Sequence, residues 1–371
     1  MSLFLFNHFV HNIPILLYFT GQLKDFRKLT PSQHLKAEID NRVKMISEKV
    51  IFSVVIPSFN AKKTICQTLN AILNQRTDYK YEVIVVDSSN DGTQELIAQK
   101  YPQVRLLRLK NQTLPGSGRN LGIRSARGKY IAFTDADCIP EMDWLQRIAK
   151  NFQEINTDAV GGCLINGYPS SITAWVSHLI EFNEWTETTP AGYMTNIPSA
   201  NLAYKKTTFY RLGVQFTDVF PSEDTIFNWT MYQKGAKIYF DPKIKVVHLN
   251  RVVLRKLLQH QYWLGLASAE ARRSTTLPGH IFVRHPILGV GLPAIRWIRT
   301  FGRLLQKDIH KLCIFIAVTP FYLIAAIAWS LGFVRQGNFS VAIFTLKSKK
   351  MLTKTDDPEN KNDRISKRGF K

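Results

Sequence analysis

The sequence predicts an α/β protein with a mainly parallel sheet flanked by helices, followed by a membrane-associated helical region. Two observations predict this class. Between residues 50 and 164, short β-rich apolar runs alternate with stretches in which apolar residues recur at helical spacing, which is the pattern of βαβ units. Further along, residues 312–334 contain no charged side chain, and a run of this length can cross a hydrocarbon core of roughly 30 Å.

Four strands are predicted in the first half of the chain, at residues 51–56, 81–86, 104–109 and 130–134. Helical patterns separate them; after the first strand, for example, apolar residues recur from Ile65 to Leu73 at three- and four-residue spacing. Further on we expect a helix at 144–152, a strand at 158–164, an aromatic-rich helix within 172–189 and a strand at 244–247.

Carboxylates follow two of these strands. Asp87 ends the second strand, and Asp135 and Asp137 follow the fourth. The carboxyl ends of parallel strands meet at one sheet edge, where ligands of open α/β folds bind. Carboxylate oxygens suit Mg²⁺ or Mn²⁺, which complete their coordination with water and substrate phosphates. The pattern therefore predicts a metal–diphosphate site, although Asp-x-Asp at a strand end also suits turn and helix-capping chemistry.

Two further segments carry candidate polar groups. The stretch Gly116–Gly122 almost spells a dinucleotide-binding loop, but its third glycine comes one residue late and no strand feeds it directly. We interpret it as a loop entering a helix, in which Arg119 meets an anion, a base edge or a surface acid. Glu223 and Asp224 follow Ser222, either as first-turn acids of a capped helix or as a general base.

The composition of the chain limits the kinds of partner that it is expected to bind. The 371 residues carry a formal net charge of +21, and the basic residues concentrate in the C-terminal third, beside the longest apolar run. No nucleic-acid motif accompanies them, so the charge favours an anionic membrane surface over nucleic acid. The four cysteines lack CxxC spacing, which predicts reduced thiols and a cytosolic catalytic part rather than a disulfide framework or a zinc site.

Taken together, the motifs resemble the family 2 glycosyltransferases, inverting enzymes of the GT-A fold that use a nucleotide-diphosphate sugar. The resemblance covers about residues 50–275. Its motifs stand in the family's order: Val54–Asn60, Val85–Asp87 with Asp91–Thr93, Gly118–Asn120 with Gly122 and Ala126-x-Gly128, Phe133–Asp137, Ala200-Asn201, Glu223-Asp224 and His248.

For the donor, the resemblance implies that four residues line the nucleotide base pocket: Pro57, Phe59, Asp87 and Arg119. Asp135 is then expected to contact the ribose or the metal. Asp137 and His248 are expected to hold the Mg²⁺ or Mn²⁺.

For the acceptor, the resemblance makes Asp224 the base that removes the hydroxyl proton, with Glu223 beside it in the acceptor region. Gln261 and Trp263 lie in a run, Gln-Tyr-Trp-Leu-Gly, similar to that of relatives that transfer one sugar to a lipid-linked or exopolysaccharide acceptor. The implied activity is single transfer from a UDP-sugar to a hydroxyl of a lipid-linked or polysaccharide acceptor.

Two alternative functions belong to other classes of protein. A metal-dependent nucleotidyltransferase would need a basic, glycine-rich loop after the first strand, and Pro57–Asn60 is not one. A non-catalytic membrane scaffold that keeps the fold is disfavoured by intact carboxylates at Asp135, Asp137 and Asp224.

The predicted organisation has four parts: an interfacial lead-in segment at 1–48, a catalytic domain at 49–275, a membrane-associated region at 276–346 and a basic tail at 347–371. Within the third part we expect an interfacial helix at 281–301 and a transmembrane helix at 312–334. Five basic residues between 296 and 311 precede that helix, which by the positive-inside rule predicts a catalytic domain facing the cytoplasm.

Overall fold

The computed structural model describes residues 49–337. The chain divides into two units, Met1–Lys49 and Val50–Lys371, and every helix and strand described below belongs to the second. The predicted lead-in segment at 1–48 and the predicted tail at 347–371 lie outside the described residues.

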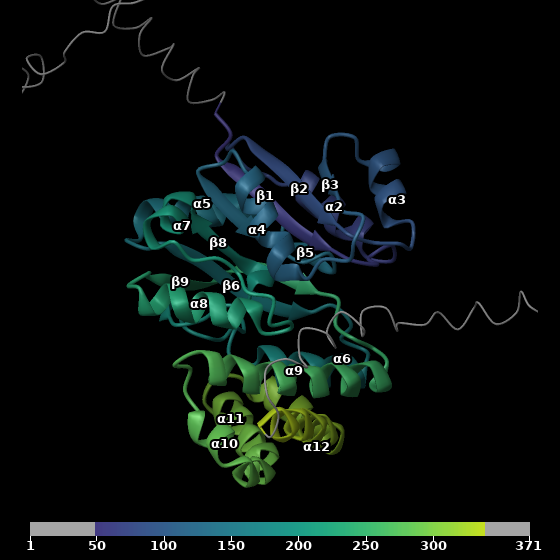
Figure 1. Cartoon of the computed structure of the whole chain (residues 1–371), viewed down its shortest axis with the longest axis vertical. Coiled ribbons are helices and arrows are strands. Elements are labelled where there is room, and N and C mark those ends of the chain that lie inside the picture. Colours follow the sequence, from purple (N-terminus) through teal and green to yellow (C-terminus); the bar gives the residue numbers. More distant parts are fainter. Residues whose placement is uncertain (1–48, 338–371) are drawn as a thin grey trace, which may run out of the picture. The chain divides into compact units, whose positions relative to one another are not determined.

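The described residues form a nine-stranded sheet in the order β3-β2-β1-β4-β8-β6-β9-β5, with β7 also paired to β9. The strands are β1 (Phe52–Ser58), β2 (Tyr81–Asp87), β3 (Arg105–Arg108), β4 (Tyr130–Phe133), β5 (Cys138–Pro140), β6 (Ala159–Asn166), β7 (Gly192–Met194), β8 (Leu202–Lys205) and β9 (Ile238–His248). Helices flank this sheet (Figure 1), and the predicted α/β class is confirmed.

Strand directions divide the sheet into two halves. Strands β1 to β4 are parallel, as predicted. Beyond β4 the sheet is mixed, because β8 runs antiparallel to both β4 and β6 while β6 and β9 are parallel. The short strands β5 and β7 add antiparallel pairs to β9. The description "mainly parallel" therefore fits the first half only.

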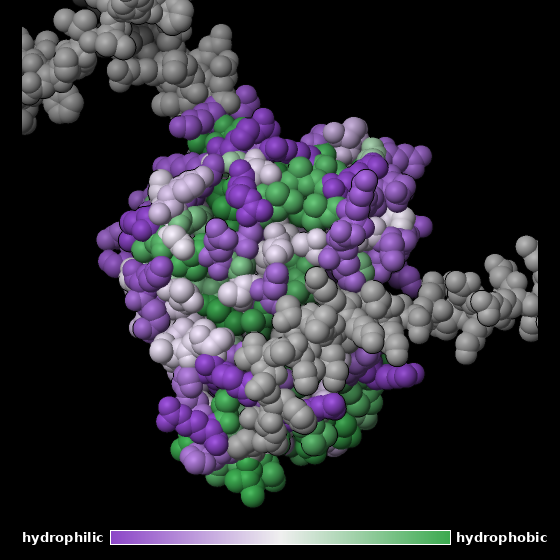
Figure 2. Space-filling model, in the orientation of Figure 1, coloured by the Kyte–Doolittle hydropathy of each residue, from purple (hydrophilic) through white to green (hydrophobic). Residues whose placement is uncertain are grey.

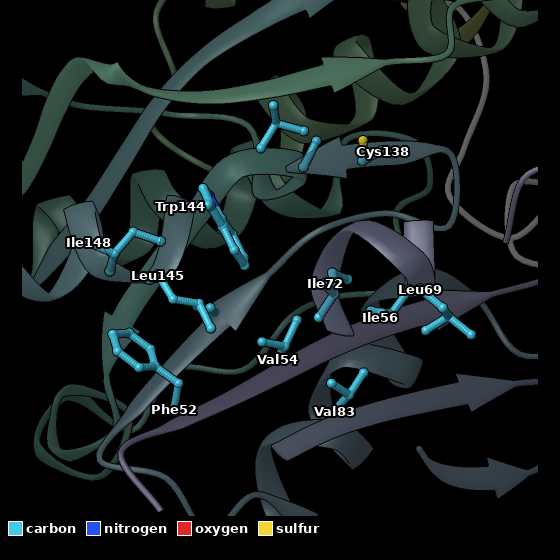
Figure 3. Close-up of a cluster of buried hydrophobic side chains, with 14 of the residues drawn as sticks. Phe52, Val54, Ile56, Leu69, Ile72, Val83, Cys138, Trp144, Leu145 and Ile148 are labelled. Carbon is cyan, nitrogen blue, oxygen red and sulfur yellow. The ribbon is translucent and has the colours of Figure 1, made fainter. Parts of the chain in front are cut away.

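The core explains why β1 is apolar at almost every position. Phe52, Val54 and Ile56 face one hydrophobic cluster, and Val55 faces another. Figure 3 shows the first cluster, in which Trp144 and its neighbours cover one face of the sheet. A strand buried on both faces has a continuous hydrophobic run rather than an alternating one.

The helices sort onto the two faces of the sheet by their buried residues. Those contributing to the Phe52 cluster are α2 (Ile65–Leu73), α3 (Thr93–Lys100) and α5 (Trp144–Glu154). Those contributing to the Val55 cluster are α4 (Pro115–Ser125), α7 (Lys206–Leu212) and α8 (Glu223–Gln233). A Cβ atom at Gly122 of α4 would lie 2.2 Å from Cγ1 of Val55, so glycine allows α4 to approach β1 closely.

A helical region follows the sheet. It comprises α6 (Ile172–Phe182), inserted earlier in the chain, and then α9 (Leu254–Ser274), α10 (His280–Arg284), the 3-10 helix η3 (Pro286–Gly291), α11 (Leu292–Lys307) and α12 (Ile309–Gly337). The prediction of one continuous helix at 281–301 is wrong, because two helices, α10 and α11, separated by η3, occupy this stretch. Pro286, Gly289, Gly291 and Pro293 interrupt the helical pattern there.

Helices α9 and α12 cross at two glycines. A Cβ atom on Gly265 would lie 1.9 Å from the carbonyl oxygen of Trp329, and one on Gly332 would lie 1.9 Å from that of Tyr262. Neither clash can be relieved by a side-chain rotation, since each involves backbone atoms. The crossing therefore depends on both glycines.

Within the described residues, one helix is long and apolar enough to cross a membrane, Ile309–Gln336, with a mean hydropathy of 2.3 over its most apolar stretch. It includes the predicted span 312–334. One face is buried against α6, α9 and α11 through residues such as Phe315, Tyr322 and Trp329. Its other face exposes Ile316, Ile324, Ile327 and Leu331. Hydrophobic residues are prominent over this helical region in Figure 2.

Candidate active site

A cavity of about 850 Å³ opens where the strand ends meet the helical region. Asp135 and Asp137, in the connection between β4 and β5, both line it, as the sequence predicts. Glu223 and Asp224, the first residues of α8, line it as well. The fold thus gathers four carboxylates from two distant parts of the chain.

Arg119 connects two of these carboxylates. From the middle of α4, its guanidinium donates to Oδ1 of Asp135 at 2.6 Å and to Oε1 of Glu223 at 2.7 Å. Its side chain is 3% exposed, and its Nε has no hydrogen-bond partner among the described residues. Arg119 therefore binds anions, as predicted, but these anions are two carboxylates of the cavity lining, the buried Glu223 and the partly exposed Asp135, rather than a surface acid.

Glu223 and Asp224 have different environments although they are neighbours. Burial, aided by the nearby Asp224 charge and opposed by Arg119, raises the pKa of Glu223 to about 7. Asp224 is only partly buried and its Oδ2 accepts from the backbone N–H of Ser199 at 3.2 Å. Its Oδ1 accepts from the N–H of Thr225 at 2.7 Å. Of the two, Asp224 has the geometry of an accessible base, because Glu223 is committed to Arg119.

Asp137 and His248 form a candidate metal centre with Cys138. Strand β5 pairs with the end of β9, which sets Cys138 opposite His248, and Nε2 of His248 lies 3.9 Å from Oδ1 of Asp137. Burial, together with the Asp137 and Asp135 charges, raises the pKa of the Cys138 thiol well above its usual range. A neutral thiol is a poor ligand for Mg²⁺ or Mn²⁺, so the donors that fit are the carboxylate and the imidazole.

Asn250 determines which nitrogen of His248 is free. The Nδ2 group of Asn250 donates to Asn166 at 3.1 Å and to the backbone oxygen of His248 at 3.2 Å. Its Oδ1, 3.1 Å from Nδ1 of His248, is therefore an acceptor for an Nδ1–H. This leaves the Nε2 lone pair directed toward Asp137, as a metal ligand requires.

Not all of the residues predicted to line the base pocket lie in a cavity lining. Pro57 and Phe59 line the main cavity and also an adjoining hollow of about 50 Å³. Asp87 is fully buried and accepts from the N–H of Ser89 at 2.8 Å and from its hydroxyl at 2.9 Å. It is absent from the lining of both cavities described here, whereas its neighbour Ser88 lines the hollow.

Gln261 and Trp263 lie on α9 outside the cavity lining. Gln261 is buried and donates to Oε1 of Glu181 at 2.8 Å, while Trp263 packs in a small cluster with Tyr262. Glu181 itself lines the cavity, and sequence reasoning missed it. Although burial alone would raise the pKa of Glu181, His260 and Arg251 lower it to about 2. The signal that identifies it is an acid close to the end of a largely apolar helix.

All four cysteines, Cys66, Cys138, Cys163 and Cys313, are free, in agreement with the predicted reduced thiols. Three arginines of α11 that line the cavity, Arg296, Arg299 and Arg303, were predicted only as part of a basic membrane flank, and Arg272 of α9 was not singled out. The spacing of these arginines along α11 does not indicate, from the sequence alone, that they line a cavity.

Comparison with known proteins places this site in a family context. Residues 53–213 match the family model described as glycosyl transferase family 2. This match includes Asp87, Arg119, Asp135 and Asp137, and ends before Glu223.

Among curated proteins, the chain is similar to glycosyltransferase AglE of Haloferax volcanii, with 37% identity over 135 residues, or 35% of this chain and 44% of that protein. It is also similar to chondroitin synthase of Escherichia coli, with 28% identity over 313 residues, or 70% of this chain and 44% of that protein. The chain thus spans less than half the length of either relative.

Among solved structures, the chain is similar to residues 1–349 of S. aureus TarS in complex with UDP-GlcNAc. The TM-score is 0.46 at 17% identity, covering 79% of this chain and 93% of that one.

Proposed function

Because the chain belongs to glycosyl transferase family 2, we propose that it transfers a sugar from a UDP-sugar to a hydroxyl of a lipid-linked or polysaccharide acceptor at a membrane, with inversion. One observation carries this proposal: Asp137, His248 and Asp224 line a single cavity. A pair of cation ligands and an accessible carboxylate are the groups that such a displacement needs from the protein.

Asp224 acts as the base in this proposal. Its carboxylate accepts the proton of the acceptor hydroxyl as the hydroxyl oxygen forms a bond to the anomeric carbon of the donor. The bond from that carbon to the diphosphate oxygen breaks, and UDP leaves with the electron pair. Ser199 and Thr225 hold the carboxylate in place, which keeps it oriented for this proton transfer.

Arg119 and Asp135 act on the donor. Arg119 fixes Asp135 at 2.6 Å, and Asp135 remains partly exposed to the cavity, in reach of a ribose or a metal-bound water. Pro57 and Phe59 offer flat apolar surface to a nucleotide base. We place Asp87 behind this surface, where it orders the Ser88–Ser89 turn.

Asp137 and His248 are the residues that would hold a Mg²⁺ or Mn²⁺. Such an ion neutralises the charge that develops on a departing diphosphate. The matching donor types and the Asn250 contact that frees Nε2 of His248 support this assignment.

The membrane part of the proposal rests on the helical region. Of the large hydrophobic residues exposed in the described residues, most lie on α10, η3, α11 and α12, between Ile281 and Leu331. We propose that this region, about residues 276–346, holds the catalytic domain, 49–275, at the cytoplasmic face of a membrane. Because α12 is buried on one face, entry of only its outer face into the bilayer is compatible with the same surface.

Calorimetric titration of UDP into the full chain in neutral detergent tests the donor and metal assignments. With Mn²⁺ present we expect binding that is lost on chelation and falls at least about tenfold in Asp137→Asn, since one ligand charge is removed. Asp218→Asn is the matched control, because Asp218 is exposed and bonded to Ser117 outside the cavity lining. Metal-independent UDP binding, or equal loss in both variants, would contradict the assignment.

A further inference from the structure

We propose that the arginine-lined end of the cavity binds the phosphate group of a lipid-linked acceptor; this deepens, and rests on, the proposed transfer to such an acceptor. We call this end the arginine chamber. It is the part of the cavity lined by Arg272, Arg296, Arg299, Arg303, Tyr322 and Trp329.

Among the described residues, the chamber arginines have only one carboxylate within ion-pair distance. Arg299 and Arg303 share one acid, Glu184. Arg272 and Arg296 have no carboxylate of residues 49–337 within ion-pair distance; their hydrogen bonds go to backbone oxygens of Pro278, Ser268 and Ile180. A buried or half-buried cation without a counter-charge is costly, so an anion from outside the chain would stabilise this arrangement.

Arg296 is held in one orientation and keeps one donor that is unpaired within the described part of the chain. Its guanidinium lies over the ring of Trp329, 4.4 Å from the ring centroid, and one terminal nitrogen donates to the backbone oxygen of Ile180 at 3.0 Å. Its Nε is buried and has no hydrogen-bond partner in the described structure. Stacking and the Ile180 contact fix the plane of the guanidinium, which is how arginine is prepared for phosphate oxygens.

Arg272 is close enough for its electrostatics to be coupled to Arg296. Burial, followed by the neighbouring Arg296 and Arg299 charges, lowers the pKa of Arg272 to about 10. It still carries its charge at neutral pH, so two like charges face the same chamber. A phosphate suits this pair better than a carboxylate would, because its non-bridging oxygens point in different directions and each can accept from a separate guanidinium group.

The donor diphosphate is assigned to other residues of the cavity lining. Its cation would be held by Asp137 and His248, which come from the sheet domain, whereas the chamber arginines come from α9 and α11. The cavity lining therefore includes an acidic set of residues suited to a metal–diphosphate and a basic set suited to a second phosphate. A two-substrate reaction with a phosphorylated acceptor needs both.

The wall of the chamber indicates that this phosphate belongs to a lipid. Tyr322 and Trp329 of α12 line the chamber, while the outer face of the same helix exposes Ile316, Ile324 and Leu331. One helix thus separates bound phosphate from a surface suited to acyl or polyprenyl chains. A phosphate at the end of a long apolar chain would reach the chamber while its chain stays in the bilayer.

The test uses the full chain in neutral detergent micelles and calorimetry with three probes: geranylgeranyl monophosphate, the uncharged alcohol geranylgeraniol, and inorganic phosphate. We expect the monophosphate to bind at least about tenfold more tightly than either other probe, as charge-assisted bonds predict. Equal binding of the alcohol, or equal binding of inorganic phosphate, would overturn the proposal, the first by showing apolar partition and the second a plain anion site.

Substitutions locate the site. Arg296→Gln, which keeps a donor for Ile180, should weaken monophosphate binding about tenfold or more, and Arg296→Lys should restore part of it. Arg255→Gln is the control, because Arg255 is an exposed cation on α9 outside the cavity lining. If Arg296→Gln does not fold, Arg272→Gln provides the same comparison. Monophosphate binding that is insensitive to both arginines would overturn the chamber assignment.

A UDP titration with Mn²⁺ on the same samples separates this proposal from the one on which it rests. Wild-type protein that binds UDP but not the monophosphate refutes the chamber alone. Protein that binds the monophosphate through Arg296 but does not bind UDP supports the chamber and refutes the proposed donor site. If Arg296→Gln weakens UDP binding and leaves the monophosphate unchanged, the chamber serves the donor and the proposal fails.

Discussion

Replacing Asp224 by asparagine separates a catalytic role from a structural one. As the second residue of α8, Asp224 stabilises the start of a helix in either case. Asparagine has the same shape and an acceptor oxygen, but it does not take up a hydroxyl proton at neutral pH. We therefore expect a folded protein that has lost most of its transfer activity.

The expected losses of stability and of activity can both be given a size. Asp224 accepts at 2.7 Å from Thr225 and at 3.2 Å from Ser199, and asparagine can keep only one of these bonds with its single oxygen. Loss of the other costs about 1 kcal/mol, or about 2–4 °C in melting temperature for a domain of this size. Loss of a general base costs about 10²–10⁴ in rate, which corresponds to about 3–5 kcal/mol of activation free energy.

The assay measures UDP release and product formation with a saturating UDP-sugar and acceptor, together with thermal unfolding of the same sample. Asp218→Asn changes an equally small surface acid, whose carboxylate accepts from Ser117 at 2.8 Å, and should retain nearly full turnover. The reasoning is refuted if Asp224→Asn transfers sugar at more than a tenth of the wild-type rate while UDP affinity is unchanged. Glu223 would then be the first alternative base.

Three further predictions concern stability and metal binding. The pKa of Glu223 is about 7 in the folded protein against an ordinary value of 4.5, so its contribution to stability is fully present below about pH 4.5 and is lost as pH rises through 7. The unfolding free energy of the wild type should therefore fall between pH 5 and 8 relative to that of Glu223→Gln. Denaturant titrations in which the two proteins show the same pH dependence would contradict this. Gly332→Ala should destabilise the chain by about 1–3 kcal/mol, because its Cβ would clash with the backbone of Tyr262. Gly302→Ala on α11 is the control: a Cβ there meets open space, so the change should be neutral or stabilising by up to about 1 kcal/mol. If the two variants melt at the same temperature, α9 and α12 do not cross as described. Asn250→Ala should weaken Mn²⁺ binding about tenfold by releasing the His248 ring, with an unchanged Mn²⁺ titration as the contrary result.

The fold was predictable where sequence patterns are local and long. Strands β1, β2 and β4 and the end of β9 follow from continuous apolar runs, and the strand-end positions of Asp87, Asp135 and Asp137 follow from them. Strands β5, β7 and β8 have three, three and four residues, too short to give a recognisable alternation. Their antiparallel pairing arises from long-range contacts such as β8 between β4 and β6, which no local pattern records.

The site was predictable in its residue types but not in its connections. The roles of Asp137, His248 and Asp224 stay predictions, and the structure brings these residues to one cavity. The pairing of Arg119 with Glu223, 104 positions apart, is invisible in the sequence because it depends on how α4 and α8 pack over the same face. Glu181 and the inward arginines of α11 were missed for the same reason, since helical spacing does not say which face meets a cavity.

The charge of the chain acquires a more specific meaning from this geometry. A net charge of +21 suggests attraction to an anionic membrane surface, and exposed basic side chains are sufficient for that. Arg272 and Arg296 are different, because a surface attraction gives no reason to place them in a cavity lining with no carboxylate of the described residues within ion-pair distance. Exposed arginines would serve a membrane surface at less cost in desolvation. Their inward position is therefore better explained by a discrete anionic ligand, and the membrane-facing wall formed by α12 identifies the direction from which it comes.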